Sequence, residues 1–190
     1  MNKVLTARFE EALIYATQLH SQQVRKSSNV PYISHLLSVT ALVLEDGGDE
    51  EQAIAALLHD AIEDQGGEPT RQEIRQRFGD RVGDIVEGCT DSDTIPKPPW
   101  RDRKEAYIER FRTSSPEVRR VSLADKLHNA RSILAEHRQI GKKIWECFNG
   151  KRQGTLWYYR AIVQTAKDTG ETSRLLVQLE EVVRELEELS

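Results

Sequence analysis

The sequence predicts an all-α protein, a helical bundle of about eight to ten helices. Apolar residues recur at three- and four-residue intervals in nearly every segment of the 190-residue chain, the spacing of a buried helix face. No segment of useful length alternates between apolar and polar residues, so no strand is expected. Hydrophobic residues make up 38% of the chain, which is enough for one compact core. We therefore expect a single domain over residues 1–190.

Start and stop signals divide the first half of the chain into five helices. Pro31 introduces a helix that ends at the glycines 47–48, and Asp49 is suited to cap the helix that follows. Thr70 and Glu73 match a capping box for the next helix. The expected ranges are 5–20, 32–48, 50–64, 71–79 and 80–90.

The second half of the chain begins with its clearest loop, residues 91–100, which holds three of the six prolines. Ser115 and Pro116 open a long helix, and residues 141–154 form a broken connection. The expected helices are 101–112, 116–137, about 155–169 and 172–189. The last segment, 170–190, is an amphipathic helix packed on the bundle, although its leucine spacing also fits a short coiled-coil seam.

Charge and apolar content exclude several classes of protein. The net charge of −4 argues against a nucleic-acid binder, and no apolar run is long enough to span a membrane. The N-terminal segment is too charged for a signal peptide. Cys89 and Cys147 are isolated, which indicates reduced thiols and a cytoplasmic protein. A homo-oligomer is compatible with the sequence.

The stretch "AALLHDAIEDQGG", residues 55–67, places charged groups at the end of an apolar helix. His59 and Asp60 are adjacent, and Glu63 and Asp64 follow one helical turn later on the same side. Such a concentration of charge is costly unless a partner compensates it. The compensating partner is either a metal ion or a network of ion pairs.

Two other polar residues lie inside apolar helical sequence: His35 in "PYISHLLSV" and Asp125 in "VSLADKLHNARSIL". Together with His59 and Asp60 they supply two imidazoles and two carboxylates. This mixed nitrogen and oxygen set suits a divalent ion such as Mn²⁺ or Fe²⁺, with positions left open for water and substrate. Magnesium prefers fewer imidazoles, and structural zinc prefers thiolates.

Three motifs in this order resemble the hydrolase domain of the RelA/SpoT family, which belongs to the HD-domain metal-dependent phosphohydrolases and includes small stand-alone members. The motifs are "QVRKSSNVPYISHLLSV", "ALLHDAIEDQ" and "VSLADKLHNARSIL", and the resemblance covers roughly residues 3–165. It implies an HD-type helical bundle. It also implies an enzyme that removes the 3′-pyrophosphate from guanosine tetra- or pentaphosphate with Mn²⁺ as its metal.

The resemblance also implies a role for individual residues. The metal ligands are His35, His59, Asp60 and Asp125. Glu63 and Asp64 match the acidic pair that positions or deprotonates the attacking water. The residues that match the nucleotide-binding motifs are Arg25, Lys26, Ser27, Asn129, Arg131 and Ser132.

The sequence departs from the family pattern at several positions. Ser122 stands where the family often has lysine, Ser27–Asn29 replace the commoner glycine-containing turn, and Leu36 replaces a usual proline. These departures affect the phosphate and base contacts rather than the metal ligands. The resemblance includes no synthetase domain, so we expect hydrolysis alone.

Two other functions remain open at this point. One is an HD-domain phosphohydrolase that acts on another nucleotide, such as an adenine alarmone or a nucleoside phosphate. The other is a non-catalytic sensor that binds a nucleotide.

Overall fold

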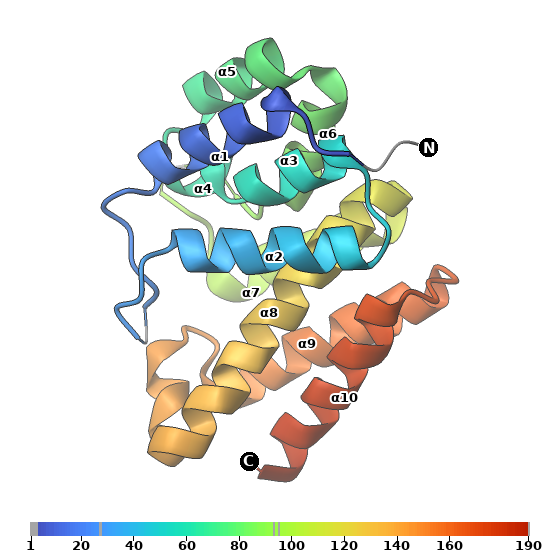
Figure 1. Ribbon diagram of the computed structural model, residues 1–190. Helices are drawn as coiled ribbons and strands as arrows, with labels where there is room; N and C mark the ends of the chain where they lie inside the picture. Colours follow the sequence, from blue (N-terminus) through green and yellow to red (C-terminus); the bar gives the residue numbers. More distant parts are fainter. Residues whose placement is uncertain (1–3, 27, 93, 95, 190) are drawn as a thin grey trace.

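The computed structural model describes residues 4–26, 28–92, 94 and 96–189 and confirms the all-α prediction (Figure 1). Within these ranges the β-structure is limited to an isolated bridge between Val24 and Pro31. The elements are α1 (Ala7–Leu19), α2 (Ile33–Glu45), α3 (Glu50–Leu58), α4 (Ala61–Asp64), α5 (Glu68–Phe78), α6 (Asp80–Cys89), α7 (Trp100–Thr113), α8 (Pro116–Ile140), the 3₁₀-helix η1 (Gly141–Cys147), α9 (Lys151–Asp168) and α10 (Arg174–Leu189).

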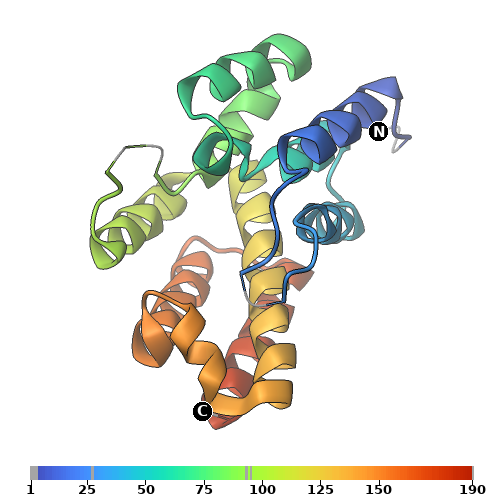
Figure 2. The ribbon, with the colours of Figure 1, turned by 90° about the vertical axis from the view of Figure 1, so that its left-hand side faces the viewer.

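Helix α8 is the central element of the fold. The Ser115 side chain caps its first turn by accepting a hydrogen bond from the Val118 amide, as the sequence predicts. The helix packs against α2, α3 and α6 on one side of the bundle and against η1 and α10 on the other. Figure 2 shows α1 to α6 gathered around one end of α8, and η1, α9 and α10 around the other. Residues in the middle of α8 therefore lie where the two groups of helices meet.

The core is densest around α3. Every residue from Ala53 to Leu58 is fully buried, because this helix carries apolar side chains all around its axis. Leu36 of α2 and Leu123 and Leu127 of α8 are also fully buried. The polar groups that follow α3 are thus held by a rigid apolar environment.

The helix expected over residues 50–64 is interrupted in the structure. Asp49 caps its start as predicted, with its carboxylate accepting a hydrogen bond from the Gln52 amide. However, α3 ends at Leu58, and Asp60 adopts φ −101° and ψ −1° before the short helix α4 begins. The break lies at His59 and Asp60, so the continuous helical spacing assumed for the four charged residues does not apply.

The capping box expected at Thr70 and Glu73 is wrong. Helix α5 begins earlier, at Glu68, because Gly67 adopts a positive φ of 62° and Pro69 fits the first helical turn. The Thr70 hydroxyl instead donates a hydrogen bond to the Gln65 carbonyl. The connection expected over residues 141–154 is also shorter than predicted, since η1 and the start of α9 lie within it.

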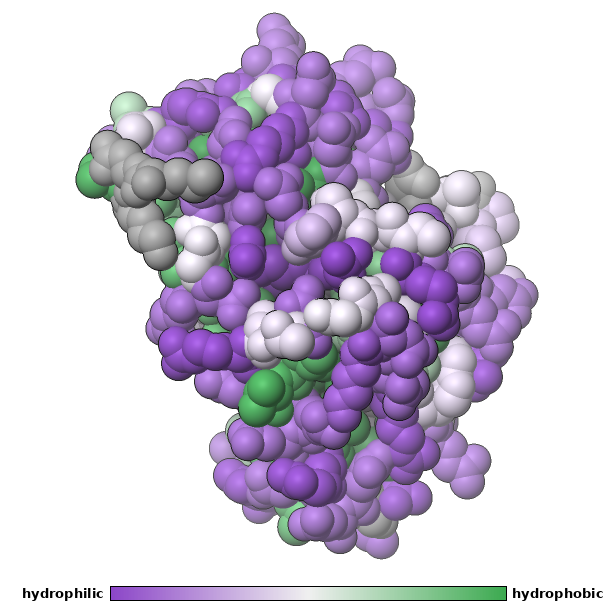
Figure 3. All heavy atoms as spheres, turned by 90° about the vertical axis from the view of Figure 1, so that its right-hand side faces the viewer, coloured by the Kyte–Doolittle hydropathy of each residue, from purple (hydrophilic) through white to green (hydrophobic). Residues whose placement is uncertain are grey.

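Helix α10 packs along α8 and α9 and buries one apolar face. The side chains of Leu176, Leu179, Val183 and Leu186 are buried within this one chain, which favours packing on the bundle over a coiled-coil seam. None of the helices described is long and apolar enough to cross a membrane. The face shown in Figure 3 is mostly hydrophilic, with small apolar areas between polar side chains.

Candidate active site

Four polar side chains from three parts of the chain meet beside the middle of α8. His35 lies in the first turn of α2, His59 and Asp60 lie at the break between α3 and α4, and Asp125 lies on α8. One ligand atom each from His35, His59 and Asp125 lie within 4.8 Å of one another. The Asp60 carboxylate adjoins them, with its Oδ2 atom 3.0 Å from Nε2 of His59 and 3.6 Å from Nε2 of His35.

This cluster has the donor set and the burial of a divalent metal site. Nε2 of His35 and Nε2 of His59 are both buried without a hydrogen-bond partner of acceptable geometry among the described residues. Both atoms face carboxylate oxygens, and His35 Nε2 lies 3.2 Å from Oδ1 of Asp125. Two imidazole nitrogens and two neighbouring carboxylates are a donor set that suits a divalent cation.

The electrostatics of the cluster favour positive charge at its centre. Burial opposes the charged form of His59, but the charge of Asp60 and the contacts with Asp125 raise the pKa of the His59 imidazole well above its ordinary value. Burial likewise opposes the charge of Asp60, whereas the His59 and His35 imidazoles lower the pKa of its carboxyl. An environment that attracts a proton to this point also attracts a divalent cation.

Neighbouring groups orient the side chains at the break. The His59 ring directs Nε2 at the cluster. Its Nδ1 atom donates a hydrogen bond to the Ala56 carbonyl, 2.8 Å away. The Tyr32 hydroxyl donates to Oδ2 of Asp60 over 2.6 Å. Contacts of this kind fix ligand geometry and tune metal affinity.

The Asp125 carboxylate is held by its own helix. Its Oδ2 atom lies 2.5 Å from Nζ of Lys126, and its Oδ1 atom accepts a hydrogen bond of 2.6 Å from the amide of Asn129. The Asn129 side chain also accepts a hydrogen bond from Arg25, at 2.7 Å. Asp125 is therefore linked through Asn129 to the loop before α2.

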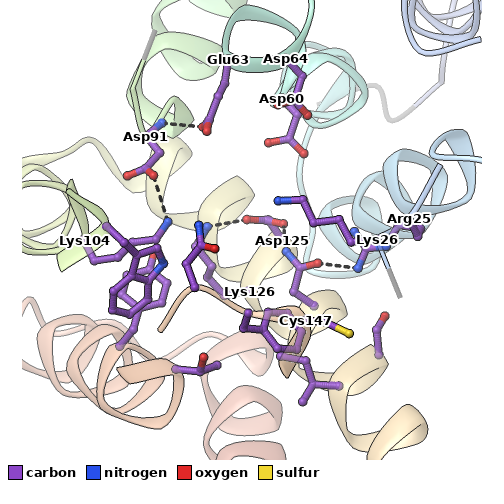
Figure 4. A pocket seen from close by; sticks show the side chains of 18 of the residues that line it. Arg25, Lys26, Asp60, Glu63, Asp64, Asp91, Lys104, Asp125, Lys126 and Cys147 are labelled. Atoms are coloured by element: carbon purple, nitrogen blue, oxygen red, sulfur yellow. Dashed lines mark hydrogen bonds and ion pairs between the residues drawn. The ribbon is translucent and has the colours of Figure 1, made fainter. Parts of the chain in front are cut away.

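Glu63 and Asp64 lie on α4 next to the cluster and point into the same cavity (Figure 4). Both oxygens of Glu63 are engaged: Oε1 by Nζ of Lys97 at 2.7 Å, and Oε2 by the backbone amide of Asp91 at 3.2 Å. Asp64 accepts one hydrogen bond of 2.7 Å from Gln23. Burial and the charge of Asp60 raise the pKa of the Asp64 carboxyl above its ordinary value.

A cavity of about 380 Å³ opens beside these residues. Figure 4 shows Arg25 and Lys26 on one side of it and Lys104 and Lys126 on another. Trp100, Tyr158 and Tyr159 also line the cavity. Its walls thus combine cations with aromatic rings, a lining suited to a nucleotide that carries several phosphates.

The structure brings most of the predicted site residues together. Those that form the cluster or line the cavity are His35, His59, Asp60, Glu63, Asp64, Asp125, Arg25, Lys26, Asn129 and Ser132. Arg131 is not among the residues that line the cavity, and its guanidinium instead donates to Gln178 of α10 over 3.0 Å. Ser27 lies outside the described residues.

Two departures from the family pattern have a structural outcome. Ser122 is buried beneath the site, where its hydroxyl accepts a hydrogen bond from Tyr107 at 2.8 Å, and it does not line the cavity. Asn29 adopts a positive φ of 55°, a conformation that glycine adopts freely and asparagine tolerates. The turn between Arg25 and Val30 therefore closes without glycine, as the hydrogen bond of 2.8 Å between their backbones indicates.

Sequence reasoning did not find several residues of the site. Lys104 lies on α7, where nothing distinguishes it from neighbouring charges; burial lowers its pKa, and its Nζ lies 3.0 Å from Oδ2 of Asp91. Gln23 and Tyr32 contact the acids across long chain distances, so no spacing rule connects them. The helical spacing of apolar residues around His35 gave no signal for Tyr32 either.

Comparison with known proteins places these features in a family. The model of the HD domain family matches residues 12–156. The chain belongs to the HD-domain family. Within the HD-domain proteins, the chain is similar to the guanosine-3′,5′-bis(diphosphate) 3′-pyrophosphohydrolase MESH1 of Xenopus tropicalis. The two are 40% identical over 126 residues, which are 65% of this chain and 68% of that protein.

Two further similarities involve a longer enzyme and a solved structure. The chain is 36% identical over 152 residues to the bifunctional (p)ppGpp synthase/hydrolase SpoT of Escherichia coli, and these residues cover 75% of this chain and 21% of SpoT. A solved structure of a metazoan SpoT orthologue that hydrolyses ppGpp superposes with a TM-score of 0.80. It has 28% sequence identity and covers 97% of this chain and 98% of the other.

Proposed function

We propose that this HD-domain protein removes the 3′-pyrophosphate from guanosine tetra- or pentaphosphate, with Mn²⁺ as its metal. The observation that carries the proposal is the cluster of two histidines and two aspartates, of which His35, His59 and Asp125 are buried, next to two acids and a cation-lined cavity. MESH1 and SpoT are similar to this chain over 126 and 152 residues. Their names support a guanosine polyphosphate as the substrate.

The four ligands in this proposal are His35, His59, Asp60 and Asp125. Bound there, a divalent ion would polarise the ester bond that joins the pyrophosphate to the ribose 3′ oxygen and would activate water. The chain itself contributes the orientation of these ligands, through the contacts of Tyr32 to Asp60 and of Ala56 to His59. The apolar surroundings of α3 limit the access of bulk solvent to this side of the site.

Glu63 and Asp64 take different parts in the reaction. Asp64 accepts the proton of the attacking water, because its raised pKa brings the carboxylate closer to the basicity that a general base needs. Glu63, held by Lys97 and by the Asp91 amide, orients the water. The attack releases pyrophosphate and leaves GDP when the substrate is the tetraphosphate.

The cations of the cavity offset the charge of the substrate. Arg25 and Lys26 approach from the loop before α2, while Lys104 and Lys126 approach from α7 and α8. Asn129 and Ser132 lie on the same face of α8 as Asp125, at positions suited to the ribose and base. We also propose a cytoplasmic location, which agrees with the free thiols of Cys89 and Cys147.

The test is hydrolysis of guanosine tetraphosphate by the purified protein with Mn²⁺, with GDP and pyrophosphate measured separately. We expect Asp64→Asn to lower kcat by about 10²–10⁴-fold, the usual contribution of a general base. The exposed Glu181 of α10 supplies a matched control, and Glu181→Gln is expected to retain the parent rate.

A panel of nucleotides distinguishes the alternatives. Cleavage of an adenine analogue but not of the guanosine substrate would leave the metal chemistry in place and change the substrate. Measured Mn²⁺ binding without cleavage of any nucleotide in the panel would favour a sensor and contradict the proposal.

A further inference from the structure

His128 contacts the proposed metal site without belonging to the predicted ligands. It lies on α8 one turn after Asp125, and its Nδ1 atom is 2.7 Å from Nδ1 of His35. The two rings are tilted by 41°, with their centroids 4.8 Å apart. A separation of 2.7 Å between two ring nitrogens requires one shared proton, because two protons would repel and none would leave no hydrogen bond.

The geometry of His35 determines which ring supplies that proton. Nε2 of His35 faces the carboxylates of Asp60 and Asp125, at 3.6 Å and 3.2 Å. As a metal ligand, this nitrogen must present its lone pair, so the proton of the neutral ring lies on Nδ1. His35 then donates the hydrogen bond, and Nδ1 of His128 accepts it.

His128 accepts this hydrogen bond through the lone pair of Nδ1. Its own ring proton then lies on Nε2. The other predicted histidine ligand has a matching arrangement, since Nδ1 of His59 contacts the Ala56 carbonyl at 2.8 Å.

We propose that His128 is a positioning residue that holds His35 in the tautomer and orientation required to bind a divalent metal through Nε2. This inference rests on the metal site of the proposed function, but not on the identity of the nucleotide. In this arrangement α8 supplies one ligand, Asp125, and on its next turn the residue that accepts a hydrogen bond from His35, the ligand on α2. Loss of such supporting contacts typically weakens metal binding 10–100-fold.

Two substitutions separate hydrogen bonding from packing. His128→Leu replaces the ring by an apolar side chain of similar length and so removes the hydrogen-bond acceptor. His128→Asn retains an acceptor, because Oδ1 of asparagine is separated from Cβ by the same number of bonds as Nδ1 of histidine. His137→Leu removes another buried histidine of α8, one that contacts Trp145 rather than the cluster, and serves as the control.

The readout is Mn²⁺ binding, measured by calorimetry on the full chain and independently of any hydrolysis. We expect His128→Leu to raise the Mn²⁺ Kd by about 10–100-fold, with His128→Asn within a few-fold of the parent and His137→Leu unchanged. Equal loss in the Leu and Asn variants of His128, or no loss in either, would overturn the proposal. Because nucleotide cleavage is not measured, a wrong substrate assignment cannot produce these results.

Nuclear magnetic resonance tests the same proposal in the unsubstituted protein, in case the leucine variant fails to fold. Protein labelled with ¹⁵N-histidine and loaded with diamagnetic Zn²⁺ reports the protonated nitrogen of each ring. We expect the proton on Nδ1 for His35 and on Nε2 for His128. The opposite assignment in either ring would contradict the proposal.

Discussion

At the scale of single residues, the two acids beside the cluster differ in how they are held. Glu63 has a partner on each oxygen, a lysine and a backbone amide. Asp64 has the single hydrogen bond from Gln23, and its burial near Asp60 disfavours the charged form. Neighbouring acids in different surroundings can therefore divide the work of orienting water and accepting its proton.

This difference predicts the pH dependence of the reaction. A general base acts in its ionised form, so kcat/KM should rise with pH through the pKa of Asp64 and level off above it. The Gln23 hydrogen bond stabilises the carboxylate and lowers that pKa, opposing the effect of burial. We therefore expect Gln23→Ala to shift the acid limb of the kcat/KM profile to higher pH.

The measurement is a pH profile of the parent and of the Gln23→Ala variant at saturating Mn²⁺. Gln22 provides the control, because it is the adjacent, exposed glutamine and Gln22→Ala should leave the profile unchanged. An acid limb at the same pH in the parent and in Gln23→Ala would exclude Asp64 as the group that titrates.

At the scale of elements, helical periodicity predicts which faces are buried better than it predicts where a helix breaks. The cap at Asp49 and the start at Ser115 were predictable, since each depends on local side-chain chemistry. The break at His59 and Asp60 was not, because its local sequence is compatible with a continuing helix. The break brings His59 and Asp60 next to His35 and Asp125, which are distant in the sequence.

The contact between α7 and α9 is a second element-scale feature that spacing does not indicate. A Cβ atom added to Gly150 would lie 2.6 Å and 2.7 Å from two ring carbons of Trp100, the first residue of α7. The absence of a side chain at Gly150 thus allows the Trp100 ring to approach the start of α9. This contact fixes the end of the helix that carries Lys104 into the cavity.

We predict that Gly150→Ala destabilises the protein by about 1–3 kcal/mol, the usual cost of overpacking. We also expect a higher KM for the nucleotide, because displacement of α7 moves Lys104. Denaturant unfolding and steady-state kinetics measure the two effects. Gln153→Ala, an exposed substitution on α9, is the control. Parent-like stability of Gly150→Ala would show that Trp100 can shift without cost.

At the scale of the whole molecule, the cluster and part of the cavity wall were predictable from the sequence, whereas the contribution of α7 was not. The ligands lie in three motifs that can be recognised along the chain. Lys104 reaches the cavity because α7 packs against α9, an outcome of tertiary contacts that no local pattern encodes. The same reason explains why Arg131, although adjacent to the motif, turns toward α10.

A surface network of ion pairs joins α6 to the start of α3 and to the N-terminal end of α8. Arg81 of α6 contacts Asp49 at 2.7 Å and Glu51 at 2.6 Å, and it also contacts Glu117 at the start of α8. Because exposed pairs contribute about 0.2–1 kcal/mol each, we expect Arg81→Ala to lower the free energy of unfolding by about 1–2 kcal/mol. The loss should shrink at high salt.

Denaturant unfolding at low and high salt checks this prediction. Arg160→Ala, which removes one exposed pair with Glu187, is the control and should cost less than about 0.5 kcal/mol. Equal effects of the two substitutions would mean that the Arg81 partners do not act as a network.

The convergence of the four proposed ligands would also make a bound metal a cross-link between parts of the chain that are far apart in sequence. The unfolded chain loses this convergence, so thermodynamic linkage requires a bound ion to stabilise the folded state. At a free Mn²⁺ concentration one hundred times the Kd, the gain would be about 2.7 kcal/mol. Chelation should therefore lower the melting temperature, and an Asp125→Asn variant should respond less. The ion that serves the reaction would then also hold α2, α3 and α8 together, so that metal supply would control the lifetime of the protein as well as its activity.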